Sequence, residues 1–412
     1  MKIVSAELLL PITSPLRRNS AIAIRAGKIL EISTRKSLKK KYPKAQEFHY
    51  QLLIPGLINA HTHLELSGFK RLSADGGFTD WLIRLIREKR KWDSASYARA
   101  AQKQIKNQLK LGITSLGDVV SDPVMLEVHH QSPLFSTAFY ELIEIREQNL
   151  NPKIDIAKAH LAEFNFAIGR TKLGLSPHTP YTASRLLYQQ AKEMSAACGL
   201  CLCTHLAESE DEVEFIRSGT GPIIERLYSK ELLMKIKFQP AFCSPAQYLA
   251  DLIDEDMTLI HCVEVSESDL EIISKARAVV HCPRSNLHLT GKLAPVPKML
   301  DAGIPVALGT DSPASAGDTN LWNEMKKVLE LRKDYPGREL KPFEILQMAT
   351  INAARAVFRE KELGSLEKGK LANLIGLKLE RISVSLNRLI SAIISSGADS
   401  IQAIFLNGEL IH

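Results

Sequence analysis

The 412-residue sequence has little of what marks secreted, membrane-spanning or nucleic-acid-binding proteins. Six cysteines are too few for a disulfide framework in a chain of this length. No apolar run approaches the roughly 20 residues that span a bilayer, and residues 1–15 lack the cleavage pattern of a secretory signal. Basic residues outnumber acidic ones only by 53 to 46, and their one dense cluster, residues 35–44, is interpreted as a solvated loop. We therefore expect a cytoplasmic protein that binds neither nucleic acid nor a membrane.

The two ends of the chain share a β-rich texture. Residues 1–54 run in short strand-like pieces broken by turn residues, with a hairpin turn expected at Gly27. Residues 365–412 contain similar pieces, the last of them folded about Gly408. We predict that both ends combine in one small β-sandwich, and that residues 55–364 form a separate, larger unit.

In this larger unit, short apolar runs alternate with segments of helical periodicity, which is typical of an α/β fold with a parallel sheet. Eight strands are expected, at residues 57–61, 113–119, 135–140, 173–176, 201–205, 258–261, 278–281 and 306–310. Histidines and other polar residues recur where these strands end. Because a barrel gathers such strand ends around one mouth, we predict a (β/α)₈ TIM barrel and not an open doubly wound sheet.

Two histidines follow the first of these strands. In His61-Thr62-His63 the imidazoles are two residues apart, so in a strand they point to the same face and can converge on one ion. Taken alone, this spacing is weak support for a metal site, since surface histidines also occur in this pattern.

Further candidate ligands end other strands of the predicted barrel. His205 closes the fifth strand and is followed three residues later by Glu208, His261 ends the sixth, and Asp311 follows the last. Histidine and carboxylate are suitable ligands for zinc or ferrous iron, and open coordination suits a catalytic ion. Any one of these residues could instead belong to a hydrogen-bonded framework. Their recurrence at matching strand ends favours a metal-dependent hydrolase.

Several sequence motifs of this chain resemble those of a known family. The motifs that carry the resemblance are PGLINAHTHLE, THLAES, TLIHC, VVHCPRSN, PVALGTDS and TINAARAVF with the later LGSLEKGKLANLIGL. They are similar to successive motifs of the amidohydrolase superfamily, in its cytosine deaminase, guanine deaminase and chlorohydrolase branch. The resemblance covers almost the whole chain and implies a barrel with a β-sandwich built from both termini. One departure is Asn373, where the family usually has Asp in this terminal unit.

The resemblance also implies roles for the strand-end residues. It implies that His61, His63, His205 and Asp311 bind one divalent metal ion, Zn²⁺ or Fe²⁺, and that Glu208 and His261 serve catalysis. Dinuclear members carry a carboxylated lysine at the end of the fourth strand, where this chain has Ser176, Pro177 and His178. A single ion is therefore expected. Asp311 is followed by Ser312 and not by a second Asp, which is closer to the cytosine and guanine deaminase type.

These roles suggest a hydrolytic mechanism. A bound divalent ion lowers the pKa of its water toward about 7, which supplies hydroxide at neutral pH. Glu208 would move protons to the ring nitrogen and the leaving ammonia, although it could instead brace His205. His261 would orient the attacking water or stabilise its developing charge. Asp311 would act both as a ligand and as a base.

Four residues are candidates for substrate binding. His178 matches a family position that contacts the substrate, and Glu65 could accept hydrogen bonds from ribose hydroxyls. Arg284 and Arg146 are candidate clamps for an anionic group, since guanidinium pairs bidentately with carboxylate. The alternatives are a framework role for His178, a solvated loop carboxylate for Glu65 and a surface position for each arginine.

The segment HTHLELS is similar to the metal-binding segment of aminodeoxyfutalosine deaminases of menaquinone synthesis. This favours deamination of a heterocyclic amine, with an adenine nucleoside derivative such as aminodeoxyfutalosine as the best candidate. Guanine, S-adenosylhomocysteine or methylthioadenosine, and chlorotriazines remain alternatives, as does amide-bond hydrolysis of the imidazolonepropionase type. A non-enzymatic scaffold is disfavoured because no expected ligand is missing. The partner is then a small-molecule substrate, and a homodimer is allowed.

Overall fold

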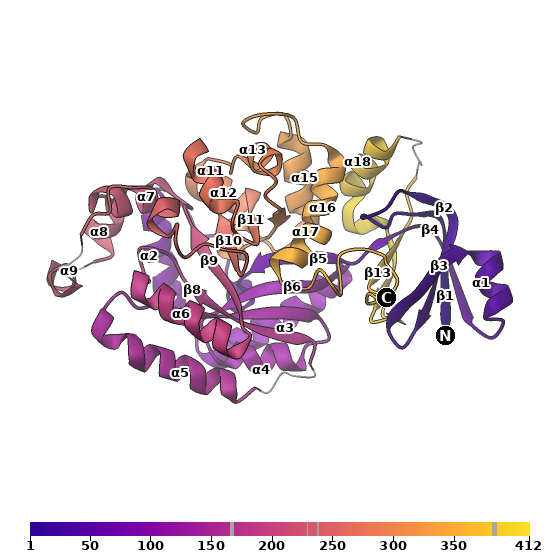
Figure 1. The fold of residues 1–412 in the computed structure, drawn as a ribbon, viewed down its shortest axis with the longest axis horizontal. Helices are drawn as coiled ribbons and strands as arrows, with labels where there is room; N and C mark the ends of the chain where they lie inside the picture. The colour runs from indigo at the N-terminus through magenta and orange to yellow at the C-terminus, as the bar shows by residue number, and fades with distance from the viewer. Residues whose placement is uncertain (165–168, 229, 237–238, 381–384) are drawn as a thin grey trace.

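The computed structural model describes residues 1–164, 169–228, 230–236, 239–380 and 385–412. These residues form an eight-stranded parallel sheet, which curves into a nearly closed barrel, and a separate seven-stranded sheet beside it (Figure 1). Both chain termini lie in the smaller sheet (Figure 1). Among the helices described, none is long and apolar enough to cross a membrane.

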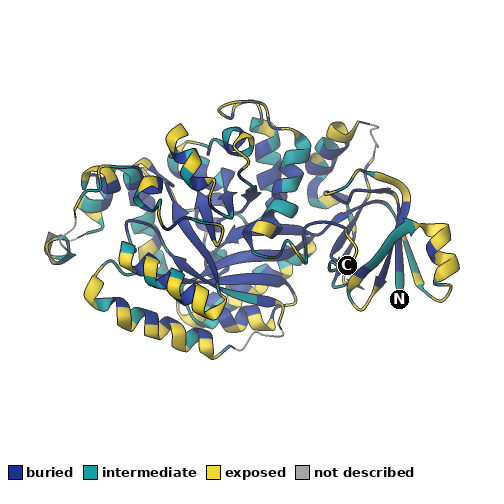
Figure 2. Ribbon diagram, in the orientation of Figure 1, coloured by how far each residue is buried: buried dark blue, intermediate teal, exposed yellow. Residues whose placement is uncertain are grey.

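The barrel strands confirm all eight sequence predictions, with boundaries that differ by one or two residues. They are β5 (Leu57–Thr62), β6 (Ile113–Val120), β7 (Phe135–Leu142), β8 (Thr171–Pro177), β9 (Cys201–Leu206), β10 (Met257–His261), β11 (Ala278–His281) and β12 (Val306–Leu308). Neighbouring strands pair in chain order and in parallel. Figure 2 shows them as the most deeply buried part of the molecule.

The edge strands β5 and β12 meet where the barrel closes. Thr62 and Asp311 form an isolated parallel bridge, and the Thr310 amide donates to the His61 carbonyl at 2.9 Å. A Cβ atom at Gly309 would lie only 2.7 Å from the Cβ of His61, so this close approach requires glycine. The backbone segments that carry His61 and Asp311 are therefore neighbours although they lie far apart in the sequence.

The amino-terminal end of the barrel is covered by α17 (Ile351–Ala356). Thr137 near the start of β7 donates to the Val357 carbonyl at 2.7 Å, and Thr258 near the start of β10 donates to the carbonyl of Ala356 at 2.8 Å. Inward-facing apolar residues fill the space above this cover. The interior of the barrel next to this cover is therefore a packed core.

The outer helices lie against the barrel with one buried face each. In α3, for example, Tyr97, Ala101 and Ile105 are buried at helical spacing, and Asp93 caps the helix by accepting from the Ser96 amide. The remaining helices are α2 (Phe78–Lys89), α3 (Ser94–Lys110), α4 (Val124–Gln131), α5 (Leu150–Ala162), α6 (Arg185–Cys198), α7 (Glu210–Ser218), α8 (Pro222–Arg226), α9 (Lys230–Ile236), α10 (Pro245–Tyr248), α11 (Glu267–Ile273), α12 (Pro283–Thr290), α13 (Val296–Asp301), α14 (Pro313–Ala316), α15 (Leu321–Leu331), α16 (Pro342–Met348) and α18 (Leu386–Ser396), with short 3₁₀ helices η1 (Leu64–Gly68), η2 (Glu147–Asn149) and η3 (Gly397–Ser400).

The smaller sheet combines both chain ends, as predicted. Its strands are β1 (Lys2–Leu9), β2 (Arg17–Arg25), β3 (Lys28–Thr34), β4 (Gln46–Pro55), β13 (Leu374–Leu377), β14 (Ile401–Leu406) and β15 (Glu409–Leu410), in the order β15-β14-β13-β4-β1-β2-β3. Asn373, the departure from the family pattern, accepts a hydrogen bond from the Asn407 amide at 2.7 Å. Its side-chain oxygen thus makes a contact that an aspartate oxygen could also make.

The basic cluster at residues 35–44 is not a loop. Its first seven residues form the helix α1 (Arg35–Lys41), which Thr34 caps by accepting from the Ser37 amide. Leu38 is buried in the small unit and anchors this helix, although the lysines around it suggest a solvated segment. The exposed basic residues make ion pairs such as Arg35 with Glu47.

Candidate metal centre and active site

Six predicted residues converge at the carboxyl-terminal end of the barrel. Each offers one potential ligand atom, and these atoms lie within 4.8 Å of one another in two groups of three. One group is His61, His63 and His205, and the other is Glu208, His261 and Asp311. The structure therefore brings together all of the residues that the sequence placed at strand ends for metal binding and catalysis.

The donor set fits a divalent metal ion. Nε2 of His61 is buried and has no hydrogen-bond partner among the described residues. It lies 3.7 Å from Oδ1 of Asp311, and Nε2 of His63 lies at the same distance from that oxygen. Two donors that each sit about 2.1 Å from one zinc ion are separated by this kind of distance. An unpartnered buried nitrogen that faces a carboxylate is what a metal ligand requires before its ion is bound.

Asp311 is held by its outer oxygen. Oδ2 accepts hydrogen bonds from Ser285 Oγ and Ser315 Oγ, both at 2.7 Å, which turns Oδ1 toward the histidines. Although burial acts in the opposite direction, the facing ring of His61 and the charge of His63 hold the pKa of Asp311 well below its usual range. The carboxylate therefore stays ionised, as a ligand must.

His205 is oriented by a backbone carbonyl. Its Nδ1 donates to the carbonyl oxygen of His178 at 3.1 Å, which leaves Nε2 as the nitrogen that faces the cluster. Its ring lies nearly parallel to that of His63, with centroids 5.5 Å apart. Burial, and then the neighbouring His61, place the pKa of His205 well below its usual value, so the ring is neutral and able to ligate.

Glu208 lies on the turn that follows β9. The backbone amides of Ala207 and Glu208 both donate to the buried carboxylate of Glu212, at 2.8 and 2.9 Å, and so fix this turn. Burial raises the pKa of Glu208 well above its usual value, with smaller contributions from the charges of Asp311 and Glu212. A carboxyl group that holds a proton near neutral pH can act as a general acid.

His261 begins a hydrogen-bonded chain that leads away from the cluster. Its Nε2 lies 3.4 Å from Oε1 of Glu208, and its Nδ1 donates to Oδ1 of Asn286 at 2.8 Å. The Asn286 amide nitrogen then donates to Nδ1 of His281 at 3.3 Å, and Nε2 of His281 donates to the Tyr335 hydroxyl at 3.0 Å. This direction of donation leaves Nε2 of a neutral His261 as a hydrogen-bond acceptor on the side of the cluster.

Sequence reasoning did not identify this chain of partners. Asn286 and His281 lie in the quoted motif VVHCPRSN, but nothing in the motif shows that they contact each other. Tyr335 is 54 residues further along and has no local signal. Glu212 was also missed, although its position four residues after Glu208 places it in the first turn of α7.

Glu65 is completely buried and already engaged. Its carboxylate pairs with Lys89 at 2.9 Å and accepts hydrogen bonds from the hydroxyl and the amide of Ser121. Burial opposes ionisation, but the charge of Lys89 and the hydrogen bonds from Ser121 and Lys89 together lower the pKa of Glu65. The predicted contact with ribose stays a prediction, and these partners occupy both oxygens of the carboxylate.

The two candidate anion clamps also have partners of their own. Arg284 forms two hydrogen bonds to the Asp318 carboxylate, at 2.6 and 3.1 Å, and one to the Ala316 carbonyl. Arg146 is exposed and pairs with Glu144 through Nε and Nη2, both at 2.9 Å. A substrate anion would have to compete with these internal carboxylates for either guanidinium. Their role as clamps stays a prediction.

His178 lies beside the cluster. Its ring centroid is 5.1 Å from that of His205, and its Nδ1 is 2.8 Å from the Thr182 hydroxyl. Its other nitrogen, Nε2, lies 3.9 Å from Oε1 of Glu141, a residue that the sequence did not single out. Of the four substrate candidates, His178 is the one whose ring packs directly on a candidate metal ligand.

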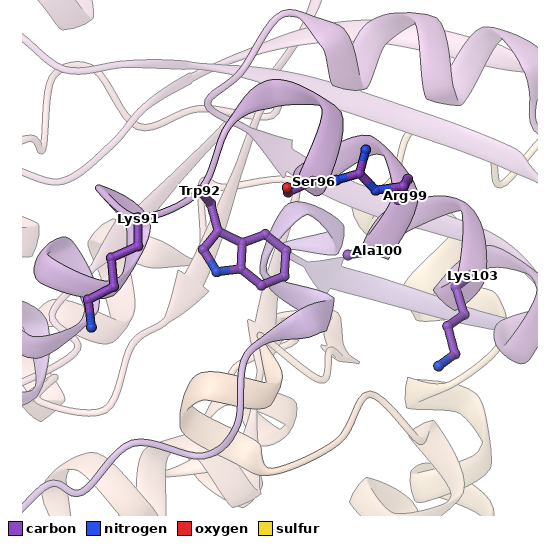
Figure 3. A pocket seen from close by; sticks show the side chains of 6 residues that line it. All are labelled: Lys91, Trp92, Ser96, Arg99, Ala100 and Lys103. Carbon is purple, nitrogen blue, oxygen red and sulfur yellow. Dashed lines mark hydrogen bonds between the residues drawn. The ribbon is translucent and has the colours of Figure 1, made fainter.

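Two surface hollows lie away from the cluster. One of about 360 Å³ is lined by Lys91 and Trp92, which precede α3, and by residues of α3 such as Arg99 (Figure 3). A larger one of about 1520 Å³ lies at the amino-terminal ends of β8 and β9, where Thr171 and Cys201 line it. Neither is lined by a residue of the histidine and carboxylate cluster.

A comparison with known families agrees with this site. The model of the amidohydrolase family matches residues 52–411. The chain belongs to the amidohydrolase family. As a member it is a hydrolase, and the matched residues include the complete barrel with its cluster of histidines and carboxylates. Members of this family use a divalent metal ion, which agrees with the fit of the donor set.

Individual proteins resemble this amidohydrolase over most of its length. The aminodeoxyfutalosine deaminase of Deinococcus radiodurans is 32% identical over 331 residues, which are 78% of this chain and 77% of the relative. The 5-methylthioadenosine/S-adenosylhomocysteine deaminase of Caldanaerobacter subterraneus subsp. tengcongensis is 31% identical over 380 residues, 88% of this chain and 81% of the relative. In fold, the crystal structure of a zinc-bound adenosine deaminase from Xanthomonas campestris superposes with a TM-score of 0.82, at 20% identity, over 99% of this chain and 92% of that one.

Proposed function

We propose that this amidohydrolase is a mononuclear metal-dependent deaminase that removes the amino group of an adenine nucleoside derivative. The observation that carries the proposal is the cluster of three histidines and Asp311, with Glu208 and His261 directly beside it. The relatives at about 30% identity are named for acting on aminodeoxyfutalosine and on methylthioadenosine or S-adenosylhomocysteine, which are all adenine nucleoside derivatives.

In this proposal His61, His63, His205 and Asp311 hold one ion, zinc or iron. The position that provides a bridging lysine in dinuclear relatives is occupied here by Ser176, Pro177 and His178. When bound, the ion lowers the pKa of a coordinated water toward about 7 and so supplies a nucleophile at neutral pH. The zinc in the Xanthomonas campestris structure favours zinc for this chain as well.

The protein's own side chains would move the protons. Glu208 carries a proton in its buried setting and donates it to the ring nitrogen next to the carbon that is attacked. It recovers a proton from the attacking water and delivers this one to the leaving amine. His261 accepts a hydrogen bond at Nε2 and so orients the water, because Asn286 fixes its Nδ1 as the donor. Ammonia and the corresponding oxo-purine are the products.

Aminodeoxyfutalosine is the first substrate to test, because of the HTHLELS segment and the Deinococcus radiodurans relative. Its distal carboxylate would require Arg284 or Arg146 to exchange an internal partner for the substrate. Methylthioadenosine and S-adenosylhomocysteine make no such demand on a benzoate clamp and are the nearest alternatives. Guanine, chlorotriazines and amide-bond substrates are more distant ones.

A panel of these substrates tests the proposal directly. Purified protein with a measured metal content is assayed for ammonia release from each compound. We expect at least one adenine nucleoside derivative to be deaminated faster than guanine, a chlorotriazine or an imidazolone amide. Activity confined to the last three, or no activity with one metal bound per chain, would overturn the proposed substrate class.

The role of Glu208 is tested with a matched pair of variants. Glu208→Gln should keep the metal and lose roughly a hundredfold to ten-thousandfold in kcat, which is the range for loss of a general acid. Glu210→Gln, two residues away, removes an exposed carboxylate that pairs with Lys292 and should leave kcat unchanged. Loss of metal from Glu208→Gln would show instead that this residue is a ligand.

We extend the proposal to the rest of the molecule. Residues 1–54 and 365–412 are proposed to form one β-sandwich, and residues 55–364 are proposed to form the separate barrel unit. A shared core of strands from both chain ends supports it, as does the Lys28–Leu371 bridge between the β3 edge and the segment before β13. We also propose a cytoplasmic location, since all six cysteines are free thiols and such thiols persist in a reducing compartment.

A further inference from the structure

Glu141 is a second carboxylate at the barrel mouth, outside the cluster that the proposed mechanism uses. It lies near the end of β7, where alternate residues face opposite sides. Phe135 and Phe139 belong to the apolar cluster inside the barrel, whereas Ala138 and Tyr140 belong to the outer core beneath the helices. Glu141 shares the parity of the two phenylalanines. Its side chain therefore lies inside the barrel, one layer above Phe139 and on the side of the metal centre.

The carboxylate of Glu141 is buried but lacks hydrogen-bond partners. Its side chain is 7% exposed, and its closest charged contact is Nε2 of His178 at 3.9 Å, which is longer than a hydrogen bond. No hydrogen bond joins it to any residue within the described part of the chain. A buried carboxylate in this state leaves several acceptor sites free for a ligand that donates hydrogen bonds.

The nearby cation Lys89 does not change this conclusion. Although burial opposes it, the charges of Glu65 and then Glu141 raise the pKa of Lys89, so the ammonium lies near both carboxylates. Its hydrogen bonds, however, go to Glu65 and to Ser121, both at 2.9 Å. The hydrogen bonds of Lys89 thus occupy acceptor sites of Glu65 and leave those of Glu141 available.

The position of Glu141 defines which part of a substrate it can reach. The carboxylate borders His178, whose ring centroid is 5.1 Å from that of His205. A group held by Glu141 therefore lies next to His178, whose ring packs on the candidate ligand His205. If the adenine ring reacts at the centre, the next part of a nucleoside is its ribose, which carries two adjacent hydroxyl donors. Two carboxylate oxygens are matched to two such donors.

We propose that Glu141 binds the vicinal 2′- and 3′-hydroxyls of the substrate ribose, with His178 beside it as the second polar side of the same subsite. This inference rests on the proposed function, since it requires a nucleoside substrate. It assigns ribose recognition to Glu141 and not to Glu65, whose oxygens Lys89 and Ser121 occupy. Glu141 is therefore a specificity residue, and a nucleoside without these hydroxyls should lose its contribution.

The test crosses two enzymes with four substrates. Wild type and Glu141→Gln are assayed with adenosine, 2′-deoxyadenosine, 3′-deoxyadenosine and 2′,3′-dideoxyadenosine, and kcat and KM are measured separately. Glu127→Gln is the matched control, because it removes an exposed carboxylate from α4. Metal content and thermal melting are measured for each variant, so that a folding defect is recognised.

We expect wild type to prefer adenosine over 2′,3′-dideoxyadenosine by about ten- to a hundredfold in kcat/KM, the range for hydrogen bonds to a charged group. Glu141→Gln should lose a similar factor on adenosine, mainly through KM, and stay within about twofold of wild type on the dideoxy substrate. Glu127→Gln should match wild type on all four substrates. A structural role for Glu141 would lower activity on all four equally.

Each other outcome overturns a distinct claim. A wild-type enzyme that deaminates neither these four nucleosides nor any adenine nucleoside derivative of the substrate panel refutes the proposed function, and the ribose contact with it. A wild-type enzyme that deaminates adenosine and dideoxyadenosine equally refutes only the ribose contact. A preference for 3′-amino-3′-deoxyadenosine over adenosine would show that the carboxylate selects a cation. If Glu141→Gln does not fold, the wild-type substrate series and Glu141→Asp, which keeps the charge, decide the same question.

Discussion

The two ends of the barrel use their polar side chains in opposite ways. At the amino-terminal end, Thr137, Thr258 and Arg359 donate hydrogen bonds to backbone carbonyls, largely those around α17. At the carboxyl-terminal end, His61 Nε2 and the carboxylate of Glu141 have no hydrogen-bond partner among the residues described. The hydrogen bonds at the first end hold backbone segments against the barrel, whereas the two unpaired groups at the second end are available for a ligand.

The backbone shows the same contrast. Ala207, His261, Cys262 and Asp311 all have positive φ values, and all lie at the carboxyl-terminal rim, whereas Phe358 is such a residue at the opposite end. Non-glycine residues with positive φ cost free energy and persist only where the surrounding structure enforces them. The rim therefore combines unpaired polar atoms with strained backbone. In this barrel the amino-terminal end, with its hydrogen bonds to backbone carbonyls, is therefore distinct from the carboxyl-terminal end, which holds the candidate metal centre.

The largest expected effect comes from removing a ligand at the rim. His61→Ala should abolish stoichiometric metal binding and lower turnover on the order of a thousandfold or more, because the nucleophile is no longer generated. Metal content by elemental analysis and ammonia release measure the two effects. His49→Ala, in the small sheet, is the control and should change neither. A His61→Ala variant that retains its metal would contradict the contrast between the two ends.

The second prediction concerns the opposite end. Arg359 is 3% exposed, and its Nη2 donates to the carbonyls of Ser136 and Arg170. Arg359→Met should cost about 2–4 kcal/mol by removing these buried hydrogen bonds, and so lower Tm by several degrees, while kcat of the folded enzyme stays unchanged. Calorimetry and assays at low temperature separate these effects. Arg35→Met, which removes an exposed ion pair with Glu47, should barely change Tm.

The third prediction returns to the rim and tests the chain of hydrogen bonds behind His261. Tyr335→Phe removes the hydroxyl that His281 contacts, so Asn286 and His261 are held less firmly. We expect kcat to fall about tenfold with KM unchanged, the size of effect known for supports behind metal sites.

The control for this variant is Tyr140→Phe. It removes a comparable contact between a buried tyrosine and a histidine, the 2.8 Å contact with His160 on the outside of the barrel. Equal losses of kcat in both tyrosine variants would show a general packing effect and contradict a specific role for the chain behind His261.

The smallest expected effect lies again at the amino-terminal end. Thr137→Val keeps the shape of the side chain but removes the hydrogen bond to the Val357 carbonyl, which should cost about 1–2 kcal/mol of stability and no activity. Thr137→Ser keeps the hydroxyl and should lie closer to wild type in Tm. A drop in kcat for Thr137→Val would mean that the two ends are coupled.

The barrel was predictable from the sequence because the strands are short apolar runs and most of them have a polar residue at or just after their ends. One difference is at β12, which ends at Leu308 and not at residue 310. Thr310 leaves the ladder because its amide bonds to His61 of the first strand. Such a contact across the closure of a barrel has no local signal. The metal cluster was predictable for the same reason as the strands, since its residues mark their ends.

The supporting residues were not predictable in this way. Glu141 ends a strand, as His205 does, but a single glutamate in an apolar sequence does not show whether its carboxylate has a partner in the fold. Glu65 shows the reverse, because its position after the histidines indicated a ligand contact although Lys89 occupies it. In both cases the deciding contact comes from a distant segment, and spacing within one motif cannot reveal it.

The bridge between Thr62 and Asp311 joins a segment that the ribosome makes early to one that it makes late. The Thr62 hydroxyl and the Asp311 carbonyl that it contacts are separated by 249 residues. A ribosome that has released the chain through His205 has produced all three imidazoles of the cluster without the carboxylate that completes it. Because the last proposed ligand, Asp311, arrives with the last strand, a nascent chain acquires the complete set of proposed ligands only when the barrel can close. Tight metal uptake would then report that the ring of strands is complete, and an aborted or truncated chain would lack this signal.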